Sequence, residues 1–390
     1  VVKPVKVVYQ DMLESILSHE GRLMEEANER REKAKVAFVV SIIVTVVSLI
    51  IPIIVYCVSK KKSLKPIFEG KYYRELVEDY GPAVMNKVLN PVLNAGSYDM
   101  LATMLDLVRR KYIEIEPIQK ENKKKPEDYI LKLVNTNLDN LNEQEQHFVR
   151  KLIFVDADKI TLKELSKKNS KTVSAQNKAA KAHEKWYKLI KKVAEQNGLI
   201  AKKKVSITKD ILKLIISPLM LIVVITYASM NGFDDIMALG MCGVFVCILE
   251  LVFAISGLYT LKMRTQKGVD HNEMWQAFRR YLLDFSKLDE HDYKSLAIWE
   301  HYLVYAAGLG VAKKVIKELK IVFPNEFKED TFNTYMTIGV LTDDGAFSSF
   351  QNSFNSASAT AFSQASTNGS GGGFSGGAGF GGGGGGGGGF

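Results

Sequence analysis

The sequence contains little cysteine and no disulfide pattern. Its 390 residues include three cysteines, Cys57, Cys242 and Cys247, and each lies within an apolar stretch. Disulfide frameworks and cysteine zinc sites need several cysteines at characteristic spacings in polar or loop segments. We therefore expect neither a disulfide-stabilised domain nor a cysteine-based metal site.

Signatures of catalysis are also missing from the sequence. It has no phosphate-binding loop and no G-x-S-x-G nucleophile motif, and its six histidines are scattered without a partner at metal-ligand spacing such as i, i+4. We accordingly expect a protein that is not an enzyme and that carries no cofactor or metal.

Charge is absent from the last part of the chain. Residues 347–390 contain no Asp, Glu, Lys or Arg; they are rich in Ser, Asn and Ala and then almost entirely Gly, with dispersed phenylalanines. This composition buries too little apolar surface to offset the entropy of ordering. We expect a disordered tail, which is either an assembly segment with Phe residues as weak contacts or an inert tether.

The sequence contains three long hydrophobic segments. Residues 37–58 carry no charge, extend over about 33 Å as a helix, and are followed by Lys60, Lys61 and Lys62. Two similar segments follow, and Pro218 interrupts the first of these. The predicted fold class is an α-helical multi-pass membrane protein with three spans, at 36–58, 211–230 and 236–261.

The turn between the second and third spans sets the expected orientation. Asn231–Asp235 contains two acids and no basic residue, whereas lysines and arginines precede the second span and follow the third. The positive-inside rule then places this turn outside and both flanking regions in the cytoplasm. By continuity, the N-terminus is expected outside and the C-terminus in the cytoplasm.

The polar region at 59–210 predicts a small α+β domain. A helix at 99–110 is followed by alternating segments at 112–116 and 129–134, which we expect to form a hairpin with a lysine-rich tip. A helix followed by a hairpin is typical of the closing half of a winged-helix fold. The pattern recurs, with helices expected at 141–154, 162–168 and 175–197 and a short wing strand at 199–202.

Two further segments complete the predicted organisation. Residues 271–285 form an amphipathic helix, and the apolar segment 296–311 is too short to span, so we expect a buried or membrane-lying helix. Val1–Tyr9 alternates like a strand, and because the chain does not begin with Met we expect it to end an external domain that is mostly missing. The expected regions are an external segment (1–35), three spans (36–58, 211–230 and 236–261), a cytoplasmic α+β region (59–210), a cytoplasmic helical region (262–346) and a disordered tail (347–390).

Several of these segments together resemble a known family. The stretches Ala102–Ile113, Trp275–Leu282 and Trp299–Gly310, with the Phe-punctuated poly-Gly end, are similar to the bacterial predicted membrane proteins grouped as domain of unknown function 2207. The resemblance covers most of residues 36–390. It implies an N-terminal external domain and implies no activity, because none is assigned to the family.

A candidate polar site lies within the spans. Glu250 is near the middle of the third span, where an ionised carboxylate is costly. In a hairpin of the second and third spans it would lie level with Ser217 and Pro218. There it could donate to the Leu214 carbonyl that Pro218 leaves free, or pair with Lys213. The candidate intramembrane polar site is therefore Glu250, Lys213 and Ser217, either as a clasp that fixes the hairpin or as a proton- or ion-responsive site.

The expected function follows from these features. We predict a non-enzymatic scaffold or signal-coupling protein that joins an external domain to cytoplasmic partners, with the lipid bilayer and possible self-association through the tail as its other contacts. Two alternatives remain open: a channel or transporter component using Glu250, and a membrane-tethered nucleic-acid binder. Nucleic acid would contact lysines at the hairpin tip and along one helix, namely Lys120, Lys123, Lys124, Lys125, Lys178, Lys181, Lys185, Lys188, Lys191 and Lys192.

Overall fold

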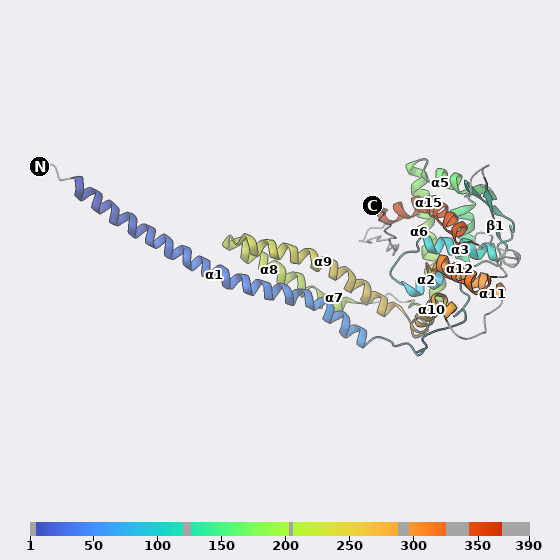
Figure 1. The fold of residues 1–390 in the computed structure, drawn as a ribbon, viewed down its shortest axis with the longest axis horizontal. Helices are drawn as coiled ribbons and strands as arrows, with labels where there is room; N and C mark the ends of the chain where they lie inside the picture. Colours follow the sequence, from blue (N-terminus) through green and yellow to red (C-terminus); the bar gives the residue numbers. More distant parts are fainter. Residues whose placement is uncertain (1–4, 120–125, 203–205, 288–295, 325–342, 369–390) are drawn as a thin grey trace, which may run out of the picture. The chain divides into compact units, whose positions relative to one another are not determined.

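The protein is mostly helical and folds as two units, shown in Figure 1. The computed structural model describes all residues except 1–4, 120–125, 203–205, 288–295, 325–342 and 369–390. The apolar unit comprises Val1–Leu64 and Lys203–Met263, and the α+β unit comprises Lys65–Lys202 and Arg264–Phe390. Each unit is therefore built from two segments that are distant in the sequence.

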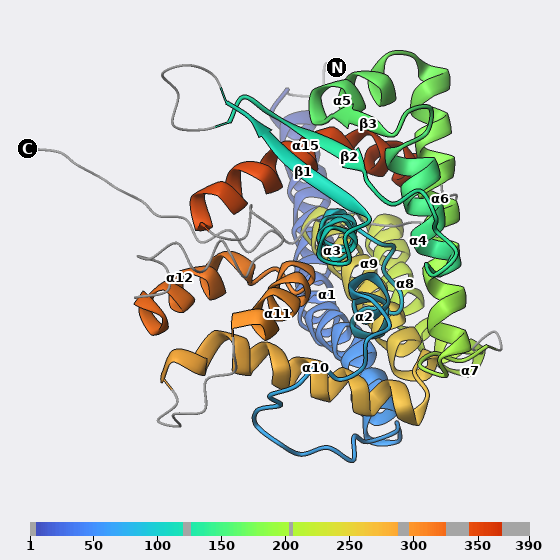
Figure 2. The same cartoon turned by 90° about the vertical axis from the view of Figure 1, so that its right-hand side faces the viewer.

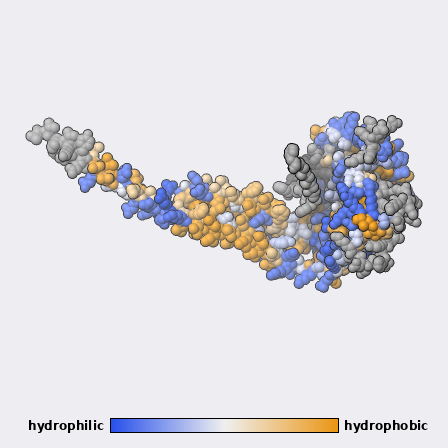
Figure 3. Space-filling model, in the orientation of Figure 1, coloured by the Kyte–Doolittle hydropathy of each residue, from blue (hydrophilic) through white to orange (hydrophobic). Residues whose placement is uncertain are grey.

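The described part of the apolar unit contains four helices: α1 (Val5–Lys61), α7 (Thr208–Leu214), α8 (Ile216–Asn231) and α9 (Asp234–Met263). Helices α1, α8 and α9 pack against one another. Three helical segments of this unit, Met12–Lys61, Thr208–Asn231 and Asp234–Met263, are long and apolar enough to cross a membrane. Figure 3 shows a hydrophobic surface along the middle of this unit with hydrophilic residues at both of its ends. The three predicted spans are confirmed as candidate membrane helices.

Pro218 explains why the second span is broken. Helix α7 ends at Leu214 and α8 begins at Ile216, so the break lies three to four residues before the proline. A proline in a helix cannot donate to the carbonyl four residues earlier, which here belongs to Leu214, and its ring clashes with that carbonyl. The interruption that the sequence predicts is therefore present at the expected place.

A tight turn joins α8 to α9. Helix α8 ends at Asn231 and is followed by Gly232, whose φ of 64° lies in the left-handed region that glycine adopts without strain. The Arg30 guanidinium of α1 donates to the Asn231 carbonyl at 3.2 Å. The end of the hairpin is thus bonded to α1 through a backbone carbonyl.

The first segment of the α+β unit supplies a three-stranded sheet and the helices around it. Strands β1 and β2 form the predicted antiparallel hairpin with Ile115 opposite Leu131, and β3 adds antiparallel to β2. Asn142, Thr161 and Thr172 accept hydrogen bonds from the first turns of α4, α5 and α6, which explains where these helices begin. The elements are α2 (Pro82–Leu89), α3 (Ser97–Arg109), β1 (Ile113–Ile118), β2 (Asp128–Leu133), α4 (Glu143–His147), the π-helix η1 (Phe148–Ile153), β3 (Lys159–Thr161), α5 (Leu162–Ser170) and α6 (Val173–Gln196).

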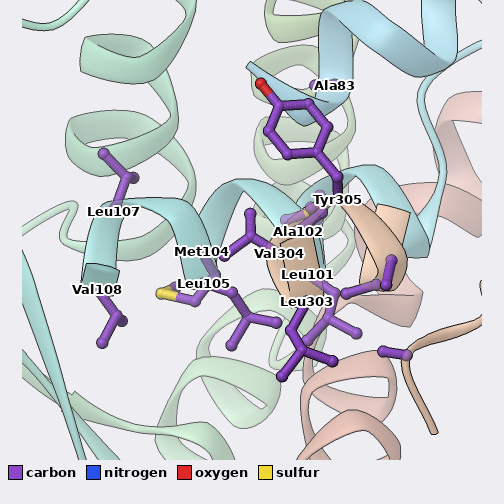
Figure 4. Packing of buried hydrophobic residues seen from close by; sticks show 14 of the residues in the cluster. Ala83, Leu101, Ala102, Met104, Leu105, Leu107, Val108, Leu303, Val304 and Tyr305 are labelled. Carbon is purple, nitrogen blue, oxygen red and sulfur yellow. The ribbon is translucent and has the colours of Figure 1, made fainter. Parts of the chain in front are cut away.

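The second segment folds into the same core. It contains α10 (Gln266–Asp284), the short η2 (Phe285–Lys287), α11 (Leu296–Gly308), α12 (Ala312–Val322) and α15 (Asp344–Asn368). Figure 2 shows α3 in the middle of the unit, and Figure 4 shows Leu101 and Leu105 of α3 close to Leu303 and Val304 of α11. These side chains are fully buried. The described parts of residues 65–202 and 264–368, which the sequence presents as separate regions, therefore share one hydrophobic core.

Helix α11 confirms the prediction for the short apolar segment. Trp299, Leu303 and Tyr305 are fully buried in the core of the α+β unit, and α11 is not among the helices long enough to span. The wing strand expected at residues 199–202 is reduced to one bridge between Ile200 and Arg264. Residues 120–125 of the expected lysine-rich tip lie outside the described residues.

The expected N-terminal strand is wrong for residues 5–9. They belong to α1, and residues 1–4 lie outside the described part of the chain. An isolated strand leaves its backbone N–H and C=O groups unpaired, whereas continuing the helix satisfies them within the segment. The alternating pattern alone was not sufficient to specify a strand.

The predicted disorder of residues 347–390 is wrong for their first half. Helix α15 covers Asp344–Asn368, and Phe347, Phe350 and Phe354 are buried. These phenylalanines are three and four residues apart, so they lie on one helical face that packs against the core. Residues 369–390 lie outside the described residues, and their expected disorder stays a prediction.

Candidate functional site

The three proposed residues of the intramembrane site do not form one cluster. Ser217 is fully buried, but its hydroxyl donates to the Ser48 carbonyl of α1 at 2.6 Å and lies 3.1 Å from the Cys247 sulfur of α9. One serine of α8 thus contacts both neighbouring helices. Polar contacts of this kind fix helix register in a bilayer. Ser217 therefore contacts α1 and α9 through partners other than the predicted ones, and the predicted clasp with Glu250 stays a prediction.

Glu250 and Lys213 are placed apart from these contacts of Ser217. The residue of α9 that Ser217 contacts is Cys247, which precedes Glu250 by three residues. Within the described residues, no hydrogen bond or ion pair joins Glu250 to Lys213 or Ser217, and Lys213 is exposed. The Oε2 atom of Glu250 is shielded and has no hydrogen-bond partner in the described part of the chain.

A second cluster lies at the start of α10, in the α+β unit. Here the chain that leaves this unit towards α7 meets the chain that returns from α9. The backbone N–H of Thr265 donates to the Leu199 carbonyl at 3.2 Å, and its hydroxyl donates to the Gly198 carbonyl at 2.5 Å. A Cβ atom on Gly268 would lie 1.9 Å from the Leu199 carbonyl oxygen, so only glycine allows this approach.

Arg264 extends the cluster to α2. Its Nε donates to the Val88 carbonyl at 2.8 Å and its Nη2 donates to the Leu89 carbonyl at 2.6 Å. These carbonyls close helix α2, where unpaired C=O groups and the helix dipole favour a cation. Arg264 therefore caps α2 while it begins the segment that returns from α9.

The chain that follows α1 bonds to the same place. The Gln266 side chain donates to the Lys65 carbonyl at 2.8 Å, and the Asp270 carboxylate accepts from the Ile67 N–H at 2.6 Å. Two of the three chain segments that connect the units are thus hydrogen-bonded to the start of α10, and the third, through Arg264, leads directly into α10 and bonds to α2. We call these residues the junction cluster: Lys65, Ile67, Val88, Leu89, Gly198, Leu199, Ile200, Arg264, Thr265, Gln266, Gly268 and Asp270.

A cleft of about 840 Å³ opens elsewhere in the α+β unit. Its charged lining is mainly acidic, with Arg110 donating to Asp106 at 3.3 Å and to Glu145 at 2.9 Å. Glu145 is nearly fully buried, and this burial raises its pKa even though Arg110 opposes the shift. The carboxylates that line the cleft are Glu78, Asp79, Asp106, Glu143 and Glu145.

Asp79, in the lining of this cleft, contacts His301, which lines a second cleft of about 560 Å³. The Tyr305 hydroxyl donates to Asp79 at 2.9 Å, and His301 Nε2 lies 3.5 Å from the same oxygen. The contact with His301 lowers the pKa of Asp79 to about 2. Sequence reasoning missed this group because more than 220 residues separate Asp79 from its partners.

The chemistry available in these clefts is limited. The residues that line them include no serine, threonine or cysteine to serve as a nucleophile. Among the described residues, no group of three His, Cys, Asp or Glu side chains could hold a metal ion. The clefts present carboxylates, one histidine and two arginines, which suit binding of polar or cationic groups.

The lysine row on α6 is partly neutralised. Lys188 pairs with Glu184 at 2.6 Å, Lys192 with Glu143 at 2.7 Å, and Lys191 lies 3.7 Å from Glu195. Lys178, Lys181 and Lys185 are exposed. The opposite face of α6, with Trp186 and Ile190, is buried in the core. This helix therefore has one structural face and one moderately basic face.

Comparison with known proteins gives one match. The family described as "Predicted membrane protein (DUF2207) C-terminal domain" matches residues 69–319, which is more than half of the chain. The match includes most of the α+β unit, all of α8 and α9, and the junction cluster from Val88 onwards. No curated protein and no solved structure matches the chain.

Proposed function

The chain belongs to the DUF2207 family of predicted membrane proteins, and from this premise we propose that it is a non-enzymatic signal-coupling protein. In this proposal, changes in the packing of its membrane helices are transmitted to the α+β unit, which contacts cytoplasmic protein partners. The observation that carries the proposal is the junction cluster, where two connecting segments bond to the start of α10 and the third bonds through Arg264 to α2.

The proposed orientation follows from charge. The turn at Asn231–Asp235 carries two acids and no Lys or Arg, and we place it outside together with the N-terminus. Basic residues gather where the chain passes between the units, as in Lys60–Lys62 and Lys202–Lys204, which places these ends in the cytoplasm. The whole α+β unit and the C-terminus are then cytoplasmic.

The proposed coupling of the membrane helices to the α+β unit depends on the short chain segment between α9 and α10. Met263, the last residue of α9, is directly followed in the chain by Arg264, which is bonded to α2. Rigid elements joined by short bonded segments transmit displacement, whereas long unbonded linkers absorb it. A shift of α9 against α1 would therefore reach α2 and α10.

Hydrogen exchange on the full chain in liposomes tests this proposal. Ser217→Val removes the hydroxyl that bonds Ser48 and should loosen α8 against α1. We expect amides in the first turns of α10 to exchange several-fold faster. Thr226→Val is the matched control, because Thr226 is exposed on α8 and its hydroxyl bonds only to carbonyls of its own helix. Equal exchange in α10 for both variants would refute coupling.

Nucleic-acid binding is a second candidate. The order α4, η1, β3, α5, α6 is similar to a winged-helix arrangement, and α6 exposes Lys178, Lys181 and Lys185. Three other lysines of α6 are engaged by glutamates, which reduces the charge available for phosphates. Coupling is preferred for this reason. Retention of the full chain on duplex DNA at low salt, with loss on Lys181→Glu, would reverse the preference.

A further inference from the structure

The described part of the apolar unit contains two separate clusters of buried apolar side chains. The turn-side cluster lies next to the turn between α8 and α9; it consists of Val224, Ala228 and Ile236, with Ala37, Val44, Phe233 and Met237 packed against it. The junction-side cluster lies where the chain leaves this unit; it consists of Ile207, Leu214, Ala254 and Leu258, with Val55, Ile211, Leu251, Ile255 and Tyr259 packed against it. Both clusters include residues of α1 and α9, so the unit packs in two halves along these helices.

A layer of polar contacts lies between the two halves. The Ser217 hydroxyl of α8 donates to the Ser48 carbonyl of α1 at 2.6 Å and lies 3.1 Å from the Cys247 sulfur of α9. These three residues are 1% exposed or less. Each lies along the chain between residues of the two clusters, which are Val44 and Val55 in α1, Leu214 and Val224 around the start of α8, and Met237 and Leu251 in α9.

Two prolines weaken the helices at this layer. Pro52 lies within α1 and is buried, and Pro218 follows Ser217 in α8. Because proline has no backbone N–H, Pro52 leaves the Ser48 carbonyl, four residues earlier, without its helical donor. Prolines are also the commonest cause of sharp bends in helices. Helices α1 and α8 therefore each have a point of easy bending beside the polar layer.

The Ser217 hydroxyl supplies the donor that Pro52 removes from α1. A carbonyl without a donor is costly in a bilayer, and side chains of neighbouring helices can replace the missing proline N–H. Other hydroxyls of this unit bond within their own helix: Ser41 and Ser48 donate to carbonyls three residues earlier, at 2.8 and 2.7 Å. The Ser217 hydroxyl therefore has an ordinary alternative on its own helix, and in the structure it bonds to α1 instead.

We propose that the apolar unit has a membrane hinge at Pro52 and the break before Pro218, and that the bond from Ser217 to Ser48 latches its packed state. In the bent state the junction-side half turns against the turn-side half, and the Ser217 hydroxyl bonds within its own helix. The Ser48 carbonyl then loses its donor, so the latch favours the packed state. Such a device has two discrete arrangements of the same helices.

The membrane hinge specifies the movement that signal coupling needs, and its role in signalling rests on that proposed function. The junction-side half contains the end of α1, helix α7 and the end of α9. These are the parts of the apolar unit from which the chain continues into the α+β unit. A bend at the hinge would therefore displace all three together, while the turn-side half keeps its own packing.

Distances between pairs of spin labels in the full chain, reconstituted in nanodiscs, test the hinge. The labels are attached through a keto amino acid, so that the native cysteines stay in place, at exposed positions. The pair Val40 and Phe253 spans the hinge, Val40 and Val223 lie in the turn-side half, and Leu212 and Phe253 lie in the junction-side half. With Ser217→Val we expect a second distance across the hinge, in a population roughly tenfold larger than in the wild type, because the latch no longer favours the packed state. The distances within each half should stay the same.

Two further variants separate the latch from general loosening. Pro52→Ala restores the N–H that pairs the Ser48 carbonyl within α1, so Ser217→Val should have no effect beside it. Thr226→Val removes a hydroxyl that bonds carbonyls of its own helix and should leave all distances unchanged.

Three results would overturn the hinge: an unchanged distance across it in Ser217→Val, equal changes in the pairs within each half, or a second distance that persists beside Pro52→Ala. A second distance across the hinge with unchanged hydrogen exchange in α10 would support the hinge and refute only its coupling to the α+β unit.

Discussion

Replacing Arg264 by alanine should weaken the α+β unit more than the loss of a surface arginine would. The change removes two hydrogen bonds from a guanidinium to the Val88 and Leu89 carbonyls, at 2.8 and 2.6 Å. Hydrogen bonds from charged groups contribute roughly 1.5–3 kcal/mol each when buried. Because Arg264 is only half-buried, we expect a combined loss of about 2–3 kcal/mol in the free energy of unfolding.

Tryptophan fluorescence measures this loss in one unit only. The protein has three tryptophans, Trp186, Trp275 and Trp299, and all are fully buried in the α+β unit. Urea unfolding of the full chain in nanodiscs, followed by fluorescence, therefore reports that unit. Arg264→Lys should recover part of the loss, since lysine keeps the charge but loses the planar fork.

The control for Arg264→Ala is Arg150→Ala. The Arg150 side chain is 41% exposed and pairs with Asp158 at 2.9 Å, and surface pairs of this kind contribute about 0–1 kcal/mol. Equal unfolding free energies for the two alanine variants would refute the reasoning, because they would show that Arg264 does not hold α2 to the returning chain.

Three further predictions follow. Gly268→Ala should cost about 2–3 kcal/mol in the unfolding of the α+β unit, because its Cβ would meet the Leu199 carbonyl at 1.9 Å, whereas Gly21→Ala in α1 meets nothing within 4 Å and should leave that unfolding unchanged. Burial lowers the pKa of His183 to about 4, so the unfolded state binds a proton at this histidine at a higher pH than the folded state does. The free energy of unfolding should therefore fall as the pH drops from about 6.5 to 4, and His183→Gln should flatten this part of its pH dependence. An unchanged pH dependence in the variant would contradict a lowered pKa at His183. Dicyclohexylcarbodiimide, which modifies protonated carboxyl groups in apolar surroundings, should label Glu250 in liposomes, and mass spectrometry that finds no adduct there would exclude a protonated carboxyl at this position.

Local sequence patterns were enough to predict the membrane helices and most of the secondary structure. Hydropathy predicted the positions of α1, α8 and α9. The missing backbone N–H of proline predicted the break before Pro218. Period-two alternation predicted the pairing of β1 with β2. Each of these depends on residues that are close together in the chain.

The junction cluster could not be predicted in this way. Arg264 and Thr265 bond to backbone carbonyls of Val88, Leu89 and Leu199, and a carbonyl leaves no mark in the side-chain sequence. Gly268 offers the only signal, since a glycine inside a helix often indicates a close approach. The Asp79–His301 contact was missed because the pairing depends on the joining of two distant segments.

The amino-acid composition of residues 347–390 did not predict helix α15, because composition averages over the segment and ignores the spacing of its phenylalanines. The low helix propensity of residues 344–368 is real, but Phe347, Phe350 and Phe354 share one face and find a partner surface. Tertiary contact overrides propensity when enough apolar area is buried on one side. For Glu250 the converse holds: the sequence identified a costly residue in a span, and the structure shows no partner for its Oε2 among the described residues.

A double-variant cycle in nanodiscs tests the coupling of the two units most directly. Tryptophan fluorescence gives the unfolding free energy of the α+β unit for the wild type, Ser217→Val, Arg264→Ala and the double variant. If the junction cluster transmits the disturbance, Ser217→Val should lower this free energy by about 1 kcal/mol in the wild type and have no effect beside Arg264→Ala. Equal effects of Ser217→Val in both backgrounds, within about 0.3–0.5 kcal/mol, would show that the units are independent and would contradict the account.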